Sequence, residues 1–278
     1  MAEPIPLSVW PVAQRTSKSQ RTRRYVPASN AHPGKMLPAL ARHIIETYTD
    51  ADDLVLDPMC GIGTTLVEAI HLGRGALGVE YEDRWAQLAQ ANIDHAYDTG
   101  ASGTATVRRR DARDLVLDPE LAGRVALVLT SPPYGPSVHG QVRAVAGQGV
   151  SKRHDRYSRD PDNLAHTSRQ ELLDGFTAIL AGCVPLLRPG GVVAITARPW
   201  RQHGCLVDLP AQAAAAAERA GLTLYERNVA LLAALRDGRL VPRSSFFQLV
   251  HVRKARQRGR PHFVIAHEDV LILRKPPA

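Results

Sequence analysis

Short apolar runs that end at polar residues and alternate with helical patterns constrain the fold of this chain most. Four strand-like runs lie at residues 54–56, 76–79, 105–110 and 125–129, and they lead to Asp57, Glu80, Asp111 and Ser131. Strands that alternate with helices predict a parallel sheet with right-handed crossovers. Ligands of such sheets bind at the carboxyl ends of the strands. We therefore expect these four side chains to share one site.

The rest of the chain continues the pattern. Apolar spacing predicts helices over residues 168–187 and 206–220, and a buried strand over 192–196. Alternation at 246–252 and 270–273 predicts antiparallel strands that close the sheet. The expected fold is a single α/β domain, with a mostly parallel seven-stranded sheet and an antiparallel C-terminal strand.

A glycine turn follows the first of these strands, with the sequence Asp57-Pro58-Met59-Cys60-Gly61-Ile62-Gly63-Thr64-Thr65. Glycine has no Cβ and tolerates positive φ, so the backbone can approach a ligand closely. The N-terminus of the helix that follows favours negative charge, which suits a carboxylate or a pyrophosphate. Thr64 and Thr65 depart from Gly-x-Gly-x-x-Gly, which disfavours a dinucleotide.

The segment Thr130-Ser131-Pro132-Pro133-Tyr134-Gly135 ends another strand. Proline fixes φ and lacks a backbone donor, so two prolines leave carbonyl groups free to point outward. Such an edge can hold the exocyclic amino group of a base while the Tyr134 ring stacks on its face.

These two segments together resemble the amino-methyltransferases, which use S-adenosylmethionine to methylate a nitrogen of a nucleobase. The Ser-Pro-Pro-Tyr form is most similar to the DNA cytosine-N4 members, and His32-Pro33-Gly34-Lys35-Met36 resembles the family's motif ten. The resemblance implies a class I, Rossmann-like methyltransferase domain. It also implies direct in-line transfer to cytosine N4, with the base flipped out of the duplex.

The resemblance implies a role for each strand end. Asp57 suits the amino group of the cofactor or caps the turn, Glu80 suits the ribose hydroxyls, and Asp111 suits the adenine amino group. The Ser131 hydroxyl and the Pro132 carbonyl are expected to accept the hydrogens of the target amine. The expected catalytic residues are Ser131, Pro132, Pro133 and Tyr134. The expected cofactor-binding residues are His32, Lys35, Asp57, Met59, Cys60, Gly61, Gly63, Thr64, Thr65, Glu80, Asp111, Ala112 and Ser131.

Other functions fit the same motifs. Adenine-N6 enzymes more often carry Asp or Asn where Ser131 stands, so serine favours cytosine. A tRNA guanosine-N2 methyltransferase uses a related Pro-Pro-Tyr edge and the same motif order. A nucleic-acid-binding protein with a degenerate methyltransferase fold is the non-enzymatic alternative, which the intact motifs disfavour.

A net charge of +8 and a pI near 9.7 suit a polyanionic partner, and double-stranded DNA is the one we expect. Residues 1–30 are expected to form a basic tail, solvated or touching phosphate. Residues 31–278 form the expected methyltransferase domain, with a long substrate loop at 136–167 and a basic insertion at 232–262. A homodimer would fit the small number of residues left for reading bases. The expected nucleic-acid contacts are Arg143, Lys152, Arg153, Arg156, Arg159, Arg256 and Arg258.

The positions of the cysteines limit which reaction the protein can catalyse and in which cell compartment it is expected. Cys60, Cys183 and Cys205 are widely spaced, so no zinc site or disulfide framework is indicated. None of them follows a proline, which argues against the thiolate chemistry of cytosine C5 methylation. We find no apolar run long enough to span a bilayer and no secretory signal, so the expected location is the cytoplasm, at the nucleoid.

Overall fold

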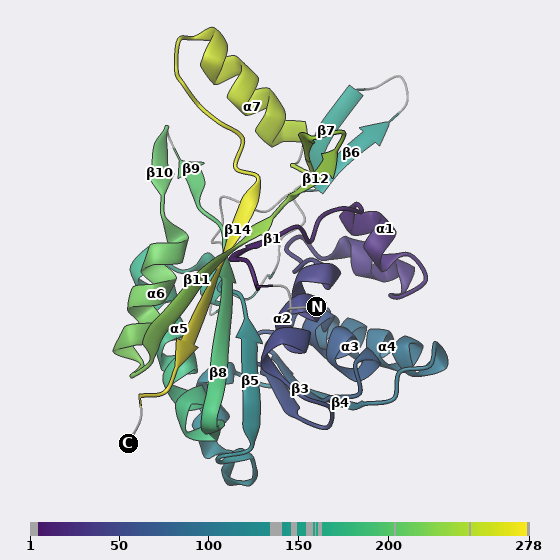
Figure 1. Cartoon of the computed structure of the whole chain (residues 1–278), viewed down its shortest axis with the longest axis vertical. Helices are drawn as coiled ribbons and strands as arrows, with labels where there is room; N and C mark the ends of the chain where they lie inside the picture. The colour runs from purple at the N-terminus through teal and green to yellow at the C-terminus, as the bar shows by residue number, and fades with distance from the viewer. Residues whose placement is uncertain are drawn as a thin grey trace.

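The computed structural model describes residues 5–133, 141–145, 149–153, 158, 160, 163–202, 204–244 and 246–276. At 116, 117, 141–145, 149–153, 246 and 247 it describes the backbone alone. Figure 1 shows an open sheet with helices on both faces. The strands are β1 Val9–Trp10, β2 Leu54–Asp57, β3 Gly75–Glu80, β4 Thr104–Arg109, β5 Val125–Thr130, β6 Gln141–Val145, β7 Gly149–Arg153, β8 Leu187–Ala197, β9 Trp200–Gln202, β10 Cys205–Val207, β11 Thr223–Leu231, β12 Ala233–Arg236, β13 Arg239–Pro242 and β14 His267–Arg274.

The helices alternate with these strands along the chain. The α-helices are α1 Ser17–Arg21, α2 Pro38–Tyr48, α3 Thr64–His71, α4 Asp83–Asp98, α5 Arg169–Cys183, α6 Leu209–Arg219 and α7 Phe246–Gln257. The 3-10 helices are η1 Pro27–Ala31, η2 Ala112–Leu117, η3 Pro119–Leu121, η4 Leu164–His166 and η5 Val184–Leu186.

The main sheet has eight strands in the order β1-β11-β14-β8-β5-β2-β3-β4. Only β14 runs antiparallel to its neighbours, β8 and β11, and the other pairs are parallel. The expected fold class is confirmed, and the strand beyond the expected seven is the two-residue β1. The order reverses between β5 and β2, which is where ligands bind in doubly wound sheets.

Two hydrophobic clusters pack the two faces of the sheet. On one face, Leu40 and Ile44 of α2 pack with Leu66 of α3 and Ile93 of α4. On the other face, Phe176 of α5 packs with residues of α6 and η2. The helices therefore fix the sheet rigidly and leave its carboxyl edge open for a site.

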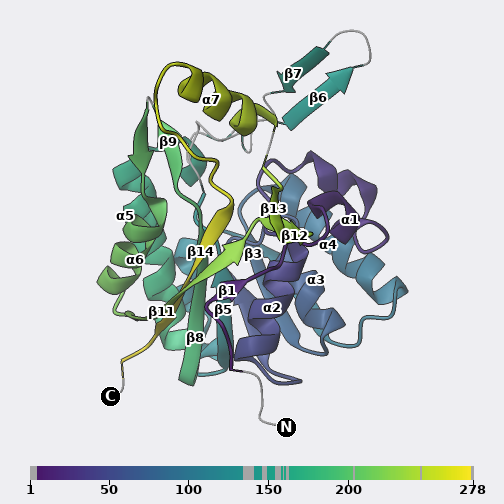
Figure 2. The same ribbon diagram turned by 45° about the horizontal axis from the view of Figure 1, so that its top comes forward.

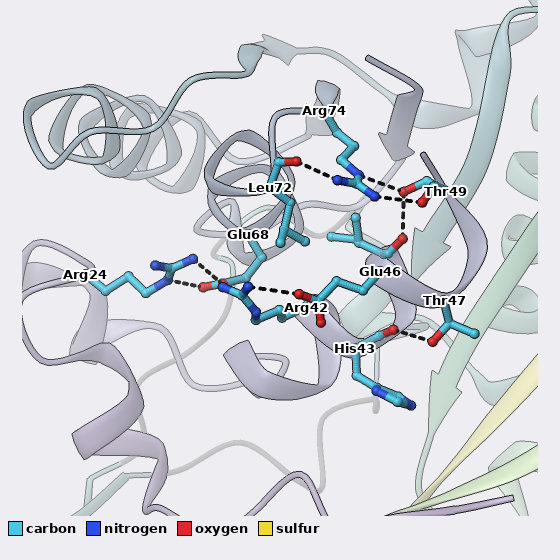
Figure 3. Close-up of polar contacts among 10 residues, drawn as sticks. Arg24, Arg42, His43, Glu46, Thr47, Thr49, Glu68, Leu72 and Arg74 are labelled. Atoms are coloured by element: carbon cyan, nitrogen blue, oxygen red, sulfur yellow. Dashed lines mark hydrogen bonds and ion pairs between the residues drawn. The ribbon is translucent and has the colours of Figure 1, made fainter. Parts of the chain in front are cut away.

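The expected solvated N-terminal tail is a packed segment from residue 9 to residue 31. Glu68 of α3 is buried and accepts hydrogen bonds from Arg24 Nε at 2.7 Å, Arg24 Nη2 at 2.6 Å and Tyr25 Oη at 2.8 Å. Figure 3 shows Arg24 reaching Glu68 across the helices. The expectation of a solvated tail was wrong for Arg24, because its acidic partner lies 44 positions away in the sequence. Arg15, Lys18 and Arg23 are exposed, as expected. The domain boundary at residue 30 stays a prediction.

The C-terminal segment 246–252, expected to be a strand, is the first part of α7. Its alternating apolar residues also match helical spacing, since Val252 and Ala255 are both buried and three positions apart. Within the expected long loop at 136–167, β6 and β7 form an antiparallel hairpin. Figures 1 and 2 both show α7 and this hairpin projecting beyond the same end of the main sheet.

Candidate active site

One cavity of about 830 Å³ opens at the carboxyl edge of the sheet. The residues at all four polar strand ends line it: Asp57 of β2, Glu80 of β3, Asp111 after β4 and Ser131 after β5. The prediction that they lie together is therefore confirmed. The cavity is also lined by His32, Lys35, Met59, Cys60, Gly61, Thr64, Thr65 and Ala112, which are all expected cofactor contacts.

The glycine turn forms the floor of the cavity. Gly61 has φ +54° and Gly63 has φ +76°, conformations that favour glycine. A Cβ at Gly61 would lie 3.0 Å from His32 Nε2, so a larger residue would crowd that ring. Gly63 is the N-cap of α3, and the helix therefore begins at the cavity.

Asp57 is buried at the end of β2 beneath this turn. Its carboxylate accepts hydrogen bonds from the Thr65 hydroxyl at 2.6 Å and from the Met59 amide at 3.1 Å. Burial raises the pKa of Asp57 to about 6, although these hydrogen bonds favour the charged form. Within the described residues no cation pairs with Asp57, so a cationic ligand group would fit this carboxylate.

Glu80 joins the turn to the next strand. Its two carboxylate oxygens accept hydrogen bonds from the Gly61 amide at 2.8 Å and the Glu82 amide at 2.9 Å. Glu80 thus holds the turn in place and also faces the cavity.

Asp111 caps η2 and accepts hydrogen bonds from the Arg113 amide at 2.9 Å and from the Arg113 guanidinium. Burial opposes its charge, but the hydrogen bonds from Arg113 outweigh burial and lower the pKa of Asp111. A ligand amine must share this carboxylate with Arg113.

The segment around His32 closes one side of the cavity. The His32 ring lies edge-on to the Trp85 ring of α4, with centroids 4.5 Å apart. Lys35 donates hydrogen bonds to the carbonyls of Asn30 and His32. Burial, with Arg21 nearby, lowers the pKa of Lys35 to about 8.

Asn92 of α4 ties the N-terminal segment to the glycine turn. Its carbonyl oxygen accepts hydrogen bonds from the Val26 amide at 3.0 Å and the Ser29 hydroxyl at 2.9 Å. Its amide group donates to the Ile62 carbonyl at 2.9 Å. The N-terminal segment is therefore anchored to the glycine turn through Asn92, a link that the sequence analysis missed.

Ser131, Pro132 and Pro133 line the cavity at the end of β5. Tyr134 lies outside the described residues, so its stacking role stays a prediction. Arg156 and Arg159 also lie outside them, as do the side chains of Arg143, Lys152 and Arg153. Arg256 and Arg258 are exposed on and just after α7, away from the cavity lining.

Further lining residues were not expected from the sequence. Thr196 and Arg198 at the end of β8 and Glu268 of β14 form the wall beyond Ser131. Tyr81 lines the cavity, and its hydroxyl donates to Asp160 at 2.9 Å. The position of Tyr81 directly after Glu80 was the one sequence signal available for it.

None of the described helices combines the length and apolarity needed to cross a membrane. Among the same residues, no cluster of three or more His, Cys, Asp or Glu side chains is arranged to hold a metal ion.

Parts of the chain are similar in sequence to known methyltransferases. A family model described as DNA methylase, of the N6/N4 type, matches residues 2–91, which include the glycine turn and Glu80 but end before Ser131. A tRNA (guanine(10)-N2)-dimethyltransferase of Methanothermobacter thermautotrophicus is 37% identical over 105 residues, 37% of this chain and 29% of that protein. The DNA adenine methyltransferase YhdJ of Escherichia coli is 29% identical over 111 residues, 40% of this chain and 35% of that protein.

The match thus spans about a third or less of the length of these curated relatives. Among solved structures, a SAM-dependent methyltransferase from Methanosarcina mazei superposes with a TM-score of 0.50 at 13% identity, over 84% of this chain and 98% of that one. The chain therefore has the fold of the S-adenosylmethionine-dependent methyltransferases, and residues 2–91 are similar to the N6/N4 DNA methylases.

Proposed function

We propose that this protein transfers a methyl group from S-adenosylmethionine to the exocyclic N4 amino group of cytosine in DNA. One observation carries the proposal: the Asp57 turn and the Ser131-Pro132-Pro133 edge line the same cavity at the reversal of strand order. A site that holds a methyl donor beside an amine acceptor needs this adjacency.

The residues present fit the cofactor. The buried carboxylate of Asp57 would accept hydrogen bonds from its cationic amino group, and the N-terminus of α3 favours its carboxylate. Glu80 and Asp111 would accept hydrogen bonds from the ribose hydroxyls and the adenine amine. Bound there, S-adenosylmethionine would supply an electrophilic methyl group on its sulfonium.

The protein's part in the chemistry is to orient the amine. The lone pair of cytosine N4 is delocalised into the ring, which makes it a weak nucleophile. Hydrogen bonds from the amine to the Ser131 hydroxyl and the Pro132 carbonyl would favour a pyramidal nitrogen that faces the methyl group. The catalytic gain then comes from proximity and alignment, with no covalent enzyme intermediate.

The projecting basic elements support a nucleic-acid substrate. Residues 238–267 contain no acidic residue and include Arg253, Lys254, Arg256, Arg258 and Arg260, all exposed. The α7 helix and the β6–β7 hairpin project beyond one end of the main sheet (Figure 2). The cavity lies among residues at the carboxyl ends of its strands. Phosphates of a duplex at the cavity would lie within reach of these elements. The match of residues 2–91 to DNA methylases favours DNA.

A guanine-N2 methyltransferase acting on tRNA is the second candidate. Its support is the 37% identity over 105 residues to the archaeal tRNA enzyme. Adenine-N6 transfer is the remaining alternative, since YhdJ is a DNA adenine methyltransferase.

Incubation with methyl-labelled S-adenosylmethionine and an equal mixture of duplex DNA and tRNA separates transfer to DNA from transfer to tRNA, and analysis of the labelled nucleoside then separates cytosine from adenine. The proposal expects label in the DNA. Label confined to tRNA would replace it with the second candidate, and an inactive protein that fails to bind the cofactor in calorimetry would exclude both.

A further inference from the structure

The wall of the cavity beyond Ser131 is built from the end of β8 and the start of β14. Thr196 belongs to β8, Arg198 directly follows that strand and Glu268 belongs to β14, and all three line the cavity. None of them belongs to the glycine turn or to the catalytic edge, so the proposed transfer leaves their role open.

The strand register places these residues on one face. Thr130 pairs with Ile195, Thr196 pairs with Val270, and Ala197 pairs with Asp269. Extending the pairing of β5 with β8 by one residue puts Ser131 beside Thr196. Extending the pairing of β8 with β14 by one residue puts Arg198 opposite Glu268. Since side chains alternate between faces, Ser131, Thr196, Arg198 and Glu268 point to the same side of the sheet.

The packing of core residues on the same strands agrees with this assignment of the four side chains to one face of the sheet. Leu129, Ala194 and Val270, each two positions from Ser131, Thr196 and Glu268, pack in the same hydrophobic cluster. Below the cavity this face is filled by α2 and α3, and at its carboxyl edge the polar residues replace the apolar ones.

The spacing suits one base. Glu268 is on the second strand over from Ser131 and is displaced from it by two residues along the strand direction. Neighbouring strands lie about 4.8 Å apart and successive residues about 3.4 Å apart, so the two Cα atoms are separated by about 12 Å. Both residues line the cavity, so a ligand in it can lie between them. A planar ring between them would contact Ser131 at one position of its edge and Glu268 at another.

Three charged or titratable side chains act on the carboxyl group of Glu268: Arg198, His267 and Asp269. Burial raises its pKa, and Asp269 adds to that shift, while Arg198 and His267 favour the charged form. Its neighbour on β11, Ala230, contributes no charge. The carboxyl group therefore retains a proton to higher pH than an ordinary glutamate does.

We propose that Glu268 hydrogen-bonds the ring nitrogen next to the target amine, and that Arg198 positions its carboxyl group. This inference rests on the proposed methyl transfer and names the residue that selects the base. Cytosine N3 is an acceptor, so Glu268 must be the protonated donor. Guanine N1 carries a hydrogen, so the same contact to guanine would require the carboxylate.

Two substitutions test the contact on cytosine DNA. Glu268→Ala removes it and is expected to lower kcat/KM by about 10- to 100-fold, the range for one good base contact. Glu268→Gln keeps a donor and is expected to hold kcat/KM within a few-fold of the wild type. It should also abolish the fall in kcat/KM as pH rises through the pKa of Glu268. The matched control is Glu218→Ala, at an exposed glutamate of α6.

Cofactor affinity, measured by calorimetry, should be unchanged in all three variants and verifies that they fold. An unaltered kcat/KM in Glu268→Ala would overturn the inference, and so would equal losses in both variants on cytosine DNA. If instead the wild type makes N2-methylguanosine in tRNA and both variants lose that activity, the cytosine assignment fails while the contact of Glu268 to the ring nitrogen stands.

Discussion

The Thr65 hydroxyl donates a hydrogen bond of 2.6 Å to the buried carboxylate of Asp57. The two residues come from the first turn of α3 and the end of β2, so this bond fixes the glycine turn between them. It also orients a carboxylate that within the described residues has no cationic partner. We infer that the bound cofactor supplies that partner.

Replacing Asp57 with Asn should weaken S-adenosylmethionine binding by about 10- to 100-fold, the worth of one charge-assisted hydrogen bond. Because the pKa of Asp57 is about 6 and the cofactor amine binds its charged form, wild-type affinity should rise with pH through about 6, with proton release. It should fall again near pH 8 as the amine of the cofactor deprotonates, at about pH 7.7–8.0. Calorimetry between pH 5 and 8 checks this, and a rise retained in Asp57→Asn would contradict it.

The same shift predicts how stability depends on pH. The folded pKa of Asp57 lies above the ordinary value of about 3.9, so the folded state binds the proton more tightly than the unfolded state. This contribution to the free energy of unfolding is present below about pH 4 and is lost as pH rises to about 6. Asp57→Asn should remove that loss in urea unfolding series.

Ser131→Ala should slow methyl transfer by about 10- to 100-fold and leave cofactor affinity nearly unchanged, because the proposed role of its hydroxyl is to orient the target amine. Single-turnover rates and calorimetry measure the two effects separately. Ser244→Ala removes another hydroxyl from the same cavity and serves as the control. Weakened cofactor binding in Ser131→Ala would show that the residue belongs to the cofactor site.

Glu68→Gln should lower the free energy of unfolding by about 2–3 kcal/mol, because it leaves Arg24 unpaired against α3. Fully buried pairs cost about 3–5 kcal/mol to break, and here the Arg24 side chain is 26% exposed. Glu46→Gln is the control: it breaks the exposed Arg42–Glu46 pair of 2.8 Å, which Figure 3 shows nearby, and should cost under about 1 kcal/mol. Equal losses would contradict the view that the N-terminal segment is anchored at Glu68.

Removing two basic side chains near α7, Arg253→Ala with Arg258→Ala, should weaken DNA binding and reduce the salt dependence of its affinity. Each lost phosphate contact lowers the slope of log K against log salt by about 0.9. Arg219→Ala, at the end of α6 and outside the cavity lining, should change neither quantity. An unchanged slope in the double variant would exclude this surface from phosphate contact.

The sequence predicted the parts of the site that depend on local pattern. Glycines at positive φ, an acid at three of the four strand ends and two consecutive prolines each have a local physical cause, and the sheet brings them together. Arg198 and Glu268 carried no such signal, because they meet only when β14 pairs with β8.

The remaining errors have the same origin. Residues 246–252 alternate like a strand, but their packing through Val252 and Ala255 is helical. The strand β1 has two residues, and its pairing with β11 is set by contacts distant in sequence. The charges of residues 1–30 suggested solvent, while Arg24 and Tyr25 meet a buried partner on α3.

Mass spectrometry of the nucleosides from duplex DNA, after incubation with the protein and labelled S-adenosylmethionine, tests the central claim most directly. The account predicts labelled N4-methylcytosine, strongly reduced when Ser131 is alanine although that variant still binds the cofactor. Unlabelled cytosine from a protein that binds both cofactor and DNA would contradict it.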